Sequence, residues 1–135
     1  MELRIGRLID HVHIVVRDLA AARQFHEAGL AALNPDLALR DGPGFFTVDE
    51  LFVSEGEPLS HIHLAFQAPD RAAVDRWHAA VLQAGGRDNG APGERSYHPG
   101  YYAAFAYDPD GNNIEAVFHG PHARSADSIT VTADL

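Results

Sequence analysis

The chain has 135 residues, of which 46% are hydrophobic, so it is long enough to bury one core without disulfide bonds. It contains no cysteine, which excludes thiolate chemistry and leaves His, Asp, Glu and backbone groups as protein ligands for any metal. The net charge of −9 argues against binding to nucleic-acid phosphates, which requires a basic surface.

Membrane and secretion signals are not recognised in the sequence. No uncharged apolar run approaches the roughly 18–20 residues that span a bilayer, and the first residues do not resemble a signal peptide. We therefore expect no membrane association and a cytoplasmic location.

The first half of the chain is predicted to form a strand, a helix and three further strands. Residues 9–16 alternate apolar positions with His11 and His13, which predicts a strand. Asp18 stands where a helix N-cap is needed, so a helix is predicted over 19–33, and Asn34-Pro35 ends it. Short strands are then predicted over 37–40, 45–48 and 50–54, with a turn at 41–44.

The second half repeats this order after a link at 55–58. A strand over 61–67 leads to Asp70, which caps a helix that continues to residue 84. The expected buried stripe of this helix is Val74, Trp77, Val81 and Leu82. A long loop over 87–100 is predicted next, with a short strand within 87–98, then strands over 101–107 and 113–118 around a turn at 108–111, and an extra strand over 129–132.

A repeat with an offset of 52 residues relates the two halves. The segment from His11 to Asp18 returns from His63 to Asp70, since 63 − 11 = 52 and 70 − 18 = 52. Two copies indicate a duplicated βαβββ module. His26 and His78 also recur at this offset, but they fall on the helices, where packing or exposure is the simpler interpretation.

Three potential metal ligands occupy comparable places in the two units. Strand alternation puts His11, His63 and Glu115 on the polar faces of their strands. Each alone would most simply be a polar surface residue. Because histidine recurs at equivalent positions and a carboxylate follows a tight turn, the set favours a divalent-metal site with positions open for water or substrate.

The segment 96–102 leads into the last hairpin and contains further candidate residues. His98, Tyr101 or Tyr102 could exchange a proton with a bound substrate. The alternative is that the two tyrosines simply alternate across a strand and that His98 is a surface loop residue.

The segments 9–19, 63–74 and 108–115 resemble the vicinal oxygen chelate superfamily, which contains glyoxalase I, bleomycin- and fosfomycin-resistance proteins and extradiol dioxygenases. The resemblance covers roughly residues 8–119 and implies an α+β fold. Two paired βαβββ modules would form a cupped mixed β-sheet with helices on its outer face. The expected single domain comprises module 1 (8–58), module 2 (60–119) and a tail (120–135).

The resemblance also implies that His11, His63 and Glu115 hold a divalent ion, which could be Zn, Fe, Mn, Ni or Mg. His13 and His61 share the relevant strand faces and remain alternatives; His11 is preferred because it precedes its capping aspartate by seven residues, as His63 does (18 − 11 = 7 and 70 − 63 = 7). Glyoxalase I has a fourth ligand on the last strand of its first module. Phe52 falls near that place here and cannot coordinate, and Glu50 would reach it only by a register slip, which argues against glyoxalase I activity.

The sequence therefore predicts a metal-dependent enzyme of lyase, isomerase, transferase or dioxygenase type, acting on a small molecule with vicinal oxygens. The alternative is a metal-independent protein that sequesters a small molecule such as an antibiotic, as bleomycin-resistance proteins do. The expected partners are a small-molecule substrate and a second copy in a homodimer, with the modules paired within one chain or exchanged between chains.

Overall fold

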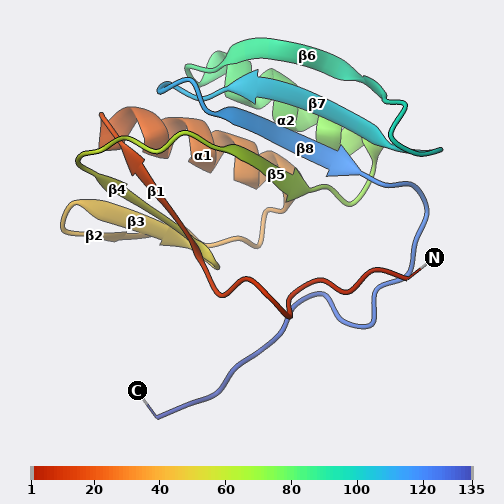
Figure 1. Ribbon diagram of the computed structural model, residues 1–135, viewed down its shortest axis with the longest axis horizontal. Coiled ribbons are helices and arrows are strands. Elements are labelled where there is room, and N and C mark those ends of the chain that lie inside the picture. The colour runs from red at the N-terminus through yellow and green to blue at the C-terminus, as the bar shows by residue number, and fades with distance from the viewer. Residues whose placement is uncertain (1, 135) are drawn as a thin grey trace.

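The computed structural model, which describes residues 2–134, consists of two βαβββ modules and two terminal segments (Figure 1). The first module comprises β1 (Val12–Val16), α1 (Leu19–Leu33), β2 (Arg40–Gly42), β3 (Phe45–Val48) and β4 (Leu51–Glu55). The second comprises β5 (His63–Gln67), α2 (Arg71–Gln83), β6 (Arg87–Glu94), β7 (Tyr102–Tyr107) and β8 (Asn113–Phe118).

Each module forms one mixed four-stranded sheet with the same strand order. The orders are β1-β4-β3-β2 and β5-β8-β7-β6. The pairs β1–β4 and β5–β8 are parallel, and the other neighbours are antiparallel. The repeat seen in the sequence is thus a repeat of topology, and the predicted α+β fold of paired βαβββ modules is confirmed.

Both helices begin at the predicted aspartate. The Oδ1 atom of Asp18 accepts a hydrogen bond from the backbone N of Ala21 at 3.1 Å, and Asp70 accepts one from Ala73 at 2.7 Å. These bonds satisfy N–H groups that have no partner inside the helix. The helix predicted over 19–33 has those bounds, and α2 ends at Gln83, just before Gly85 adopts a positive φ of 100°.

The two helices cross at close range and form the centre of one core. A Cβ atom added to Gly29 of α1 would lie 2.7 Å from both Trp77 Nε1 and Val81 Cγ1 of α2, so no larger residue fits there without movement. Both sheets pack against this helix pair through their apolar faces. The modules therefore share a hydrophobic core, and the opposite faces of their sheets point away from it.

The strands β1 and β5 begin two or three residues later than predicted, and four further predicted details were wrong. Leu37 and Leu39 pack against the core without strand pairing, so β2 begins only at Arg40. No strand forms over 129–132. Leu82 is 36% exposed, because the buried stripe of α2 runs through Val74, Trp77 and Val81.

The fourth error concerns the loop predicted over 87–100: the strand expected within 87–98 is present, but as β6 (Arg87–Glu94) it takes up most of the segment. The pairing of β6 with β7 shifts register between Asp88 and Gly90 and again between Gly90 and Gly93. β6 is at the edge of its sheet and has a hydrogen-bonded neighbour on one side only. Pro92, which has no backbone N–H to donate, is tolerated in such a strand. The glycines and proline that predicted a loop instead make an irregular edge strand.

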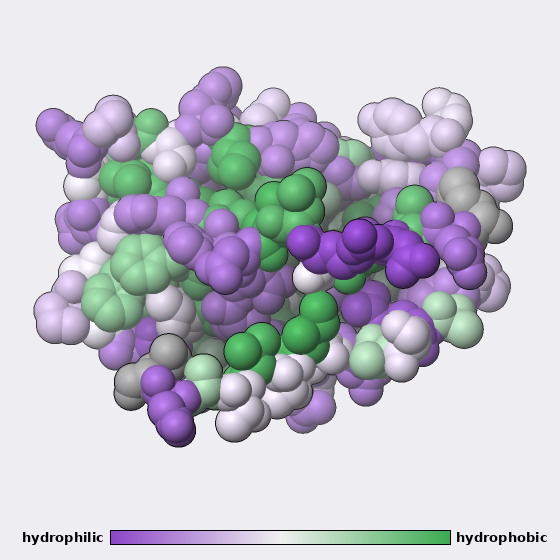
Figure 2. Space-filling view, turned by 60° about the horizontal axis from the view of Figure 1, so that its bottom comes forward, coloured by the Kyte–Doolittle hydropathy of each residue, from purple (hydrophilic) through white to green (hydrophobic). Residues whose placement is uncertain are grey.

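The segments before β1 and after β8 leave the sheets and pass close to each other (Figure 1). They carry apolar side chains that are exposed: Leu3, Ile5, Leu8, Ile9, Ile129 and Val131. Figure 2 shows the side of the molecule that lies at the bottom of Figure 1, where apolar patches are exposed among hydrophilic residues. Among the described residues, neither helix is long and apolar enough to cross a membrane.

Candidate functional site

Glu115 lies at the centre of the polar face of the module 2 sheet, which we call the inner face and define by Phe105, Asn113 and Glu115. Strand alternation puts these side chains opposite to Ile114 and Ala116, which are fully buried against the helices. Across the ladder, Glu115 pairs with Phe105 on β7 and with Ala65 on β5.

The carboxylate of Glu115 is only 2% exposed and has two side-chain partners. The Nε2 atom of His63, a side chain that is 54% exposed, lies 2.8 Å from Oε1, and the phenol of Tyr101 donates a hydrogen bond to Oε2. Burying a carboxylate is unfavourable unless such partners are present. Burial, and next the bond to Glu115, raise the pKa of Tyr101 well above its usual range, so the phenol remains a donor at neutral pH.

Two further histidines lie beside Tyr101. The Nε2 atom of His98 is 2.8 Å from Nδ1 of His119, and the Nδ1 atom of His98 is 2.8 Å from the carbonyl oxygen of Pro99. The Tyr101 ring lies edge-on to both, with ring centroids 5.3 Å from His98 and 5.1 Å from His119. Tyr101 therefore joins the imidazole pair to the buried carboxylate.

Sequence reasoning named His98 but missed His119. The available signal was the alternation of side chains along β8, continued by one residue past its end. Residues 113, 115, 117 and 119 are alternate positions, so their side chains lie on the same side of the sheet.

Tyr102 lies on the other face of the sheet. Its hydroxyl donates a 2.7 Å hydrogen bond to Asp75 of α2, and the guanidinium of Arg71 lies 4.7 Å from its ring centre. The structure thus brings Tyr101 and His98 to Glu115 and does not bring Tyr102 there.

His11 lies just before β1, on the other module. Its side chain is 64% exposed, and its Nδ1 atom is 2.6 Å from Asp10 Oδ1. Within residues 2–134 no three His, Asp or Glu side chains gather closely enough to hold a metal ion. A single chain therefore brings together His63 and Glu115, but not His11.

The strand register identifies which residues of the two modules correspond. His13 pairs with Phe52 in β1–β4, and Ala65 pairs with Glu115 in β5–β8, where 65 − 13 = 52. Phe52 thus takes the place in module 1 that Glu115 takes in module 2, and His11 corresponds to His63, as the sequence alignment predicted. The sequence alternatives have other surroundings: His13 Nε2 lies 2.7 Å from Ser54 Oγ, and His61 is exposed before β5.

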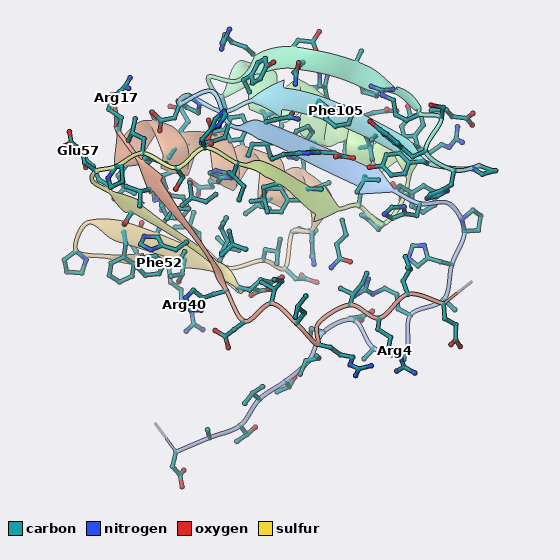
Figure 3. All side chains as sticks on the ribbon, in the orientation of Figure 1. Arg4, Arg17, Arg40, Phe52, Glu57 and Phe105 are labelled. Carbon is teal, nitrogen blue, oxygen red and sulfur yellow. The ribbon has the colours of Figure 1, made fainter. Side chains whose placement is uncertain are left out.

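Aromatic side chains occupy the corresponding face of module 1. Phe52 stacks on Phe45 with ring centroids 4.9 Å apart, and His13 lies edge-on to Phe52 at 4.7 Å. Figure 3 shows Phe52 on the module 1 sheet and Phe105 on the module 2 sheet, well separated in the molecule. The two faces are chemically different, one apolar and one built around a carboxylate.

The inner face of module 2 supplies two of the ligands that a divalent-metal site needs. An imidazole nitrogen and a carboxylate oxygen 2.8 Å apart are the ligand types that borderline ions such as Zn²⁺ accept. The Glu115 carboxylate brings negative charge into a partly desolvated place. The exposed His63 ring leaves this pair open to solvent on one side. A complete site needs at least one more donor.

Comparison with known families agrees with this fold. The sequence model of the Glyoxalase/Bleomycin resistance protein/Dioxygenase superfamily matches residues 8–116, and the chain belongs to this superfamily. No curated protein sequence matches the chain significantly.

Several solved structures have the same fold. A glyoxalase/bleomycin resistance protein from Albidiferax ferrireducens is 28% identical, with a TM-score of 0.66 over 80% of this chain and 95% of that one. A glyoxalase/bleomycin resistance protein/dioxygenase family enzyme from Burkholderia phytofirmans is 22% identical, with a TM-score of 0.62 over 81% and 96% of the two chains. A fosfomycin resistance protein from Mesorhizobium loti is 22% identical, with a TM-score of 0.61 over 84% and 92%.

Proposed function

We propose that the protein is a metal-dependent enzyme that acts on a small molecule bearing two adjacent oxygen atoms, by lyase, isomerase, transferase or dioxygenase chemistry. The observation that carries the proposal is the 2.8 Å contact between His63 Nε2 and Oε1 of the buried Glu115. A divalent ion bound by both would act as a Lewis acid towards the substrate oxygens. Superfamily membership is consistent with this chemistry.

Tyr101 positions the carboxylate in this site. Because its phenol donates to Oε2, Oε1 is the oxygen left to face His63 and an ion. A ligand held by a hydrogen bond on its other atom is oriented before the ion arrives, which favours binding.

The third ligand of the proposed site is His11 of the partner subunit in a homodimer. His11 corresponds to His63 in the repeat and is largely exposed, and within one chain it does not meet His63 and Glu115. Exposed Leu8 and Ile9 beside it supply apolar surface that a second copy would cover. Module 1 of one chain would then face module 2 of the other, and the cup between them would take the substrate.

The metal assignment is tested by metal analysis of protein purified without chelator. The parent should contain near-stoichiometric divalent metal, and His63→Ala and Glu115→Ala should contain almost none. His61→Ala is the matched control, because His61 is exposed and precedes the same strand, and it should keep the metal. Equal metal content in the parent and the two ligand variants would exclude the site.

Whether His11 is supplied by the partner chain is tested by mixing two variants that each lack one metal ligand. A dimer of one His11→Ala chain with one Glu115→Ala chain contains one intact site if His11 is supplied across the interface, and none if all ligands come from one chain. Refolding equal amounts of the two variants together makes about half of the dimers mixed, each with one intact site of two, so the mixture should regain roughly a quarter of the parent's metal content. A mixture that binds no more metal than the separate variants would contradict the exchanged arrangement.

The aromatic face of module 1 favours a second candidate function, metal-independent binding of a small molecule. The stacked Phe45–Phe52 pair offers a surface on which a planar ligand group could lie. Metal-free bleomycin in the presence of EDTA is a suitable probe. If it raises the melting temperature while no divalent ion does, the sequestration function is favoured over the enzyme.

A further inference from the structure

We propose that His119 is a catalytic residue, the general base that takes a proton from a substrate bound at the inner face of module 2, and that His98 is its positioning residue. The inference rests on the proposed enzymatic function and adds a proton acceptor to it. It follows from the hydrogen bonds of the two imidazoles and from their place beside Tyr101, which donates to Glu115.

The hydrogen bonds determine which nitrogen of His119 is free. A carbonyl oxygen can only accept, so His98 Nδ1, 2.8 Å from Pro99 O, must carry a hydrogen. The Nε2 atom of a neutral His98 is then an acceptor, and the hydrogen between the rings belongs to His119 Nδ1. The lone pair of a neutral His119 is therefore on Nε2, which is not used in the pair.

His119 is on the correct side of the sheet to meet a substrate. It continues the alternation of Asn113 and Glu115 beyond the end of β8, and it is exposed. The ring of Tyr101, which donates to Glu115, lies edge-on to it with centroids 5.1 Å apart. A small molecule that reaches Glu115 and His63 from the open side of the face would pass beside His119.

The backbone around the pair is tightly constrained. Gly100 and Gly120 have φ angles of 88° and 99°, a region that side chains disfavour. A Cβ added to Gly100 would lie 3.4 Å from the carbonyl oxygen of His119, so the two chain segments are in contact. This approach holds the loop with His98 against the end of β8 and fixes the distance between the rings.

Desolvation and the charges around His119 favour its neutral form at pH 7. Desolvation by the neighbouring groups and the proximity of His98 lower the pKa of His119, with a smaller contribution from His122. Glu115 opposes this effect, and Tyr101, the other titratable group in contact, remains an uncharged phenol. A histidine with a lowered pKa is unprotonated near neutral pH and can act as a base.

The proton then has a defined path. A C–H or O–H proton of the substrate moves to His119 Nε2, and the bonding electron pair stays on the substrate. The Nδ1 hydrogen of His119 can pass to His98 Nε2, which leaves the positive charge on His98, whose Nδ1–H donates to Pro99 O. The return of the proton to product reverses these two transfers, so no further reactant is needed.

Tautomer and protonation can be measured without substrate or metal. Two-bond ¹H–¹⁵N spectra of the ¹⁵N-labelled full chain, recorded from pH 5 to 9, should show His119 at pH 7.5 with Nδ1 protonated and Nε2 unprotonated. In His98→Ala, His119 should change to the ordinary Nε2–H tautomer, and its pKa should rise. A merely structural contact between the rings would not move the pKa or the tautomer of His119.

Proton uptake is measured by calorimetry of the zinc-loaded dimer with acetohydroxamic acid, a probe with two adjacent oxygens that binds as its anion. Titrations at pH 7.5 in phosphate and in Tris give the number of protons released to buffer. The parent should release close to none, because His119 takes the hydroxyl proton and the negative charge of the bound hydroxamate beside it stabilises the imidazolium, whereas His119→Gln should release about one with less than a twofold loss of zinc affinity.

The outcomes separate this inference from the proposed function. A parent that fails to bind zinc or the hydroxamate contradicts the enzyme proposal, and the NMR spectra still decide the state of His119. A parent that binds both but releases one proton, or a His119 that carries its hydrogen on Nε2 at pH 7.5, overturns the assignment of His119 as the base.

Discussion

The phenol of Tyr101 donates a hydrogen bond to Glu115, a carboxylate that is 2% exposed on the inner face of module 2. The neighbouring Tyr102 makes the corresponding bond on the opposite side of the sheet, to Asp75 of α2 at 2.7 Å. Adjacent tyrosines are thus each bonded to a carboxylate, one buried and one exposed. This pair allows matched comparisons.

We predict that Tyr101 ionises at a higher pH than its neighbour Tyr102. Burial and the bond to Glu115 raise its pKa in the folded state above the unfolded value of about 10. The corresponding stability is complete below pH 10 and is lost as the pH rises further. NMR of ¹³Cζ-labelled tyrosine should show Glu115→Gln lowering the pKa of Tyr101 alone, and Asp75→Asn lowering that of Tyr102 alone.

Removal of the Tyr101 hydroxyl should destabilise the fold more than removal of the Tyr102 hydroxyl. Tyr101→Phe leaves a buried carboxylate oxygen without its donor, which costs about 2 kcal/mol, whereas the exposed pair of Tyr102 is worth less than about 1 kcal/mol. Urea unfolding of the metal-free Tyr101→Phe and Tyr102→Phe variants measures the difference. Equal losses would contradict the burial of Glu115.

His26 should make the protein sensitive to acid. Its ring is 1% exposed, it packs against Phe25, Phe46 and Phe66, and neither nitrogen has a hydrogen-bond partner within the described residues. Burial lowers its pKa from 6.5 to about 4, so the unfolded state binds a proton first as the pH falls. The free energy of unfolding should therefore be unaffected by His26 above pH 6.5 and fall by roughly 3 kcal/mol between pH 6.5 and 4.

Urea unfolding at several pH values checks this prediction. His26→Leu keeps an apolar side chain in the aromatic pocket and should remove that part of the pH dependence. His61→Leu, at an exposed position, should keep the parent's slope. An unchanged slope in His26→Leu would show that His26 is not the acid-sensitive group.

The close helix crossing should not tolerate a side chain at Gly29. Even a Cβ atom there would lie 2.7 Å from Trp77 Nε1 and Val81 Cγ1, so Gly29→Leu should cost about 3 kcal/mol or more through overpacking. Ala31→Leu, two residues further on the same helix and exposed, should change stability by less than about 0.5 kcal/mol. Thermal unfolding of the two variants is a sufficient measurement.

Asn112 should be essential to the turn that joins β7 and β8. It is 1% exposed, its Oδ1 accepts from Ile62 N at 2.9 Å, and its Nδ2 donates to Asp108 Oδ2 at 3.0 Å. Asn112→Ala leaves both partners unsatisfied and should cost about 3 kcal/mol. Asn89→Ala removes an exposed amide contact and should cost less than about 0.5 kcal/mol in the same denaturant assay.

The parts of the fold that sequence predicted correctly are those set by local chemistry. The helix over 19–33 and the strand over 113–118 have the predicted bounds, because an aspartate cap and a turn define their starts. The edge strand β6 was predicted only as a short strand inside a long loop, since its pairing with β7 comes from distant residues and its Gly and Pro content is typical of loops.

By itself the sequence determined the duplicated module, the superfamily resemblance and the correspondence of His11 with His63, because a repeat and strand alternation can be read without coordinates. Only the tertiary structure decided which polar groups meet. It put Glu115 between His63 and Tyr101, added His119 beside His98, directed Tyr102 to α2, and left His11 apart on the other sheet. These contacts join strands and loops far apart in the chain, and they depend on how two sheets pack on one pair of helices, which local patterns do not specify.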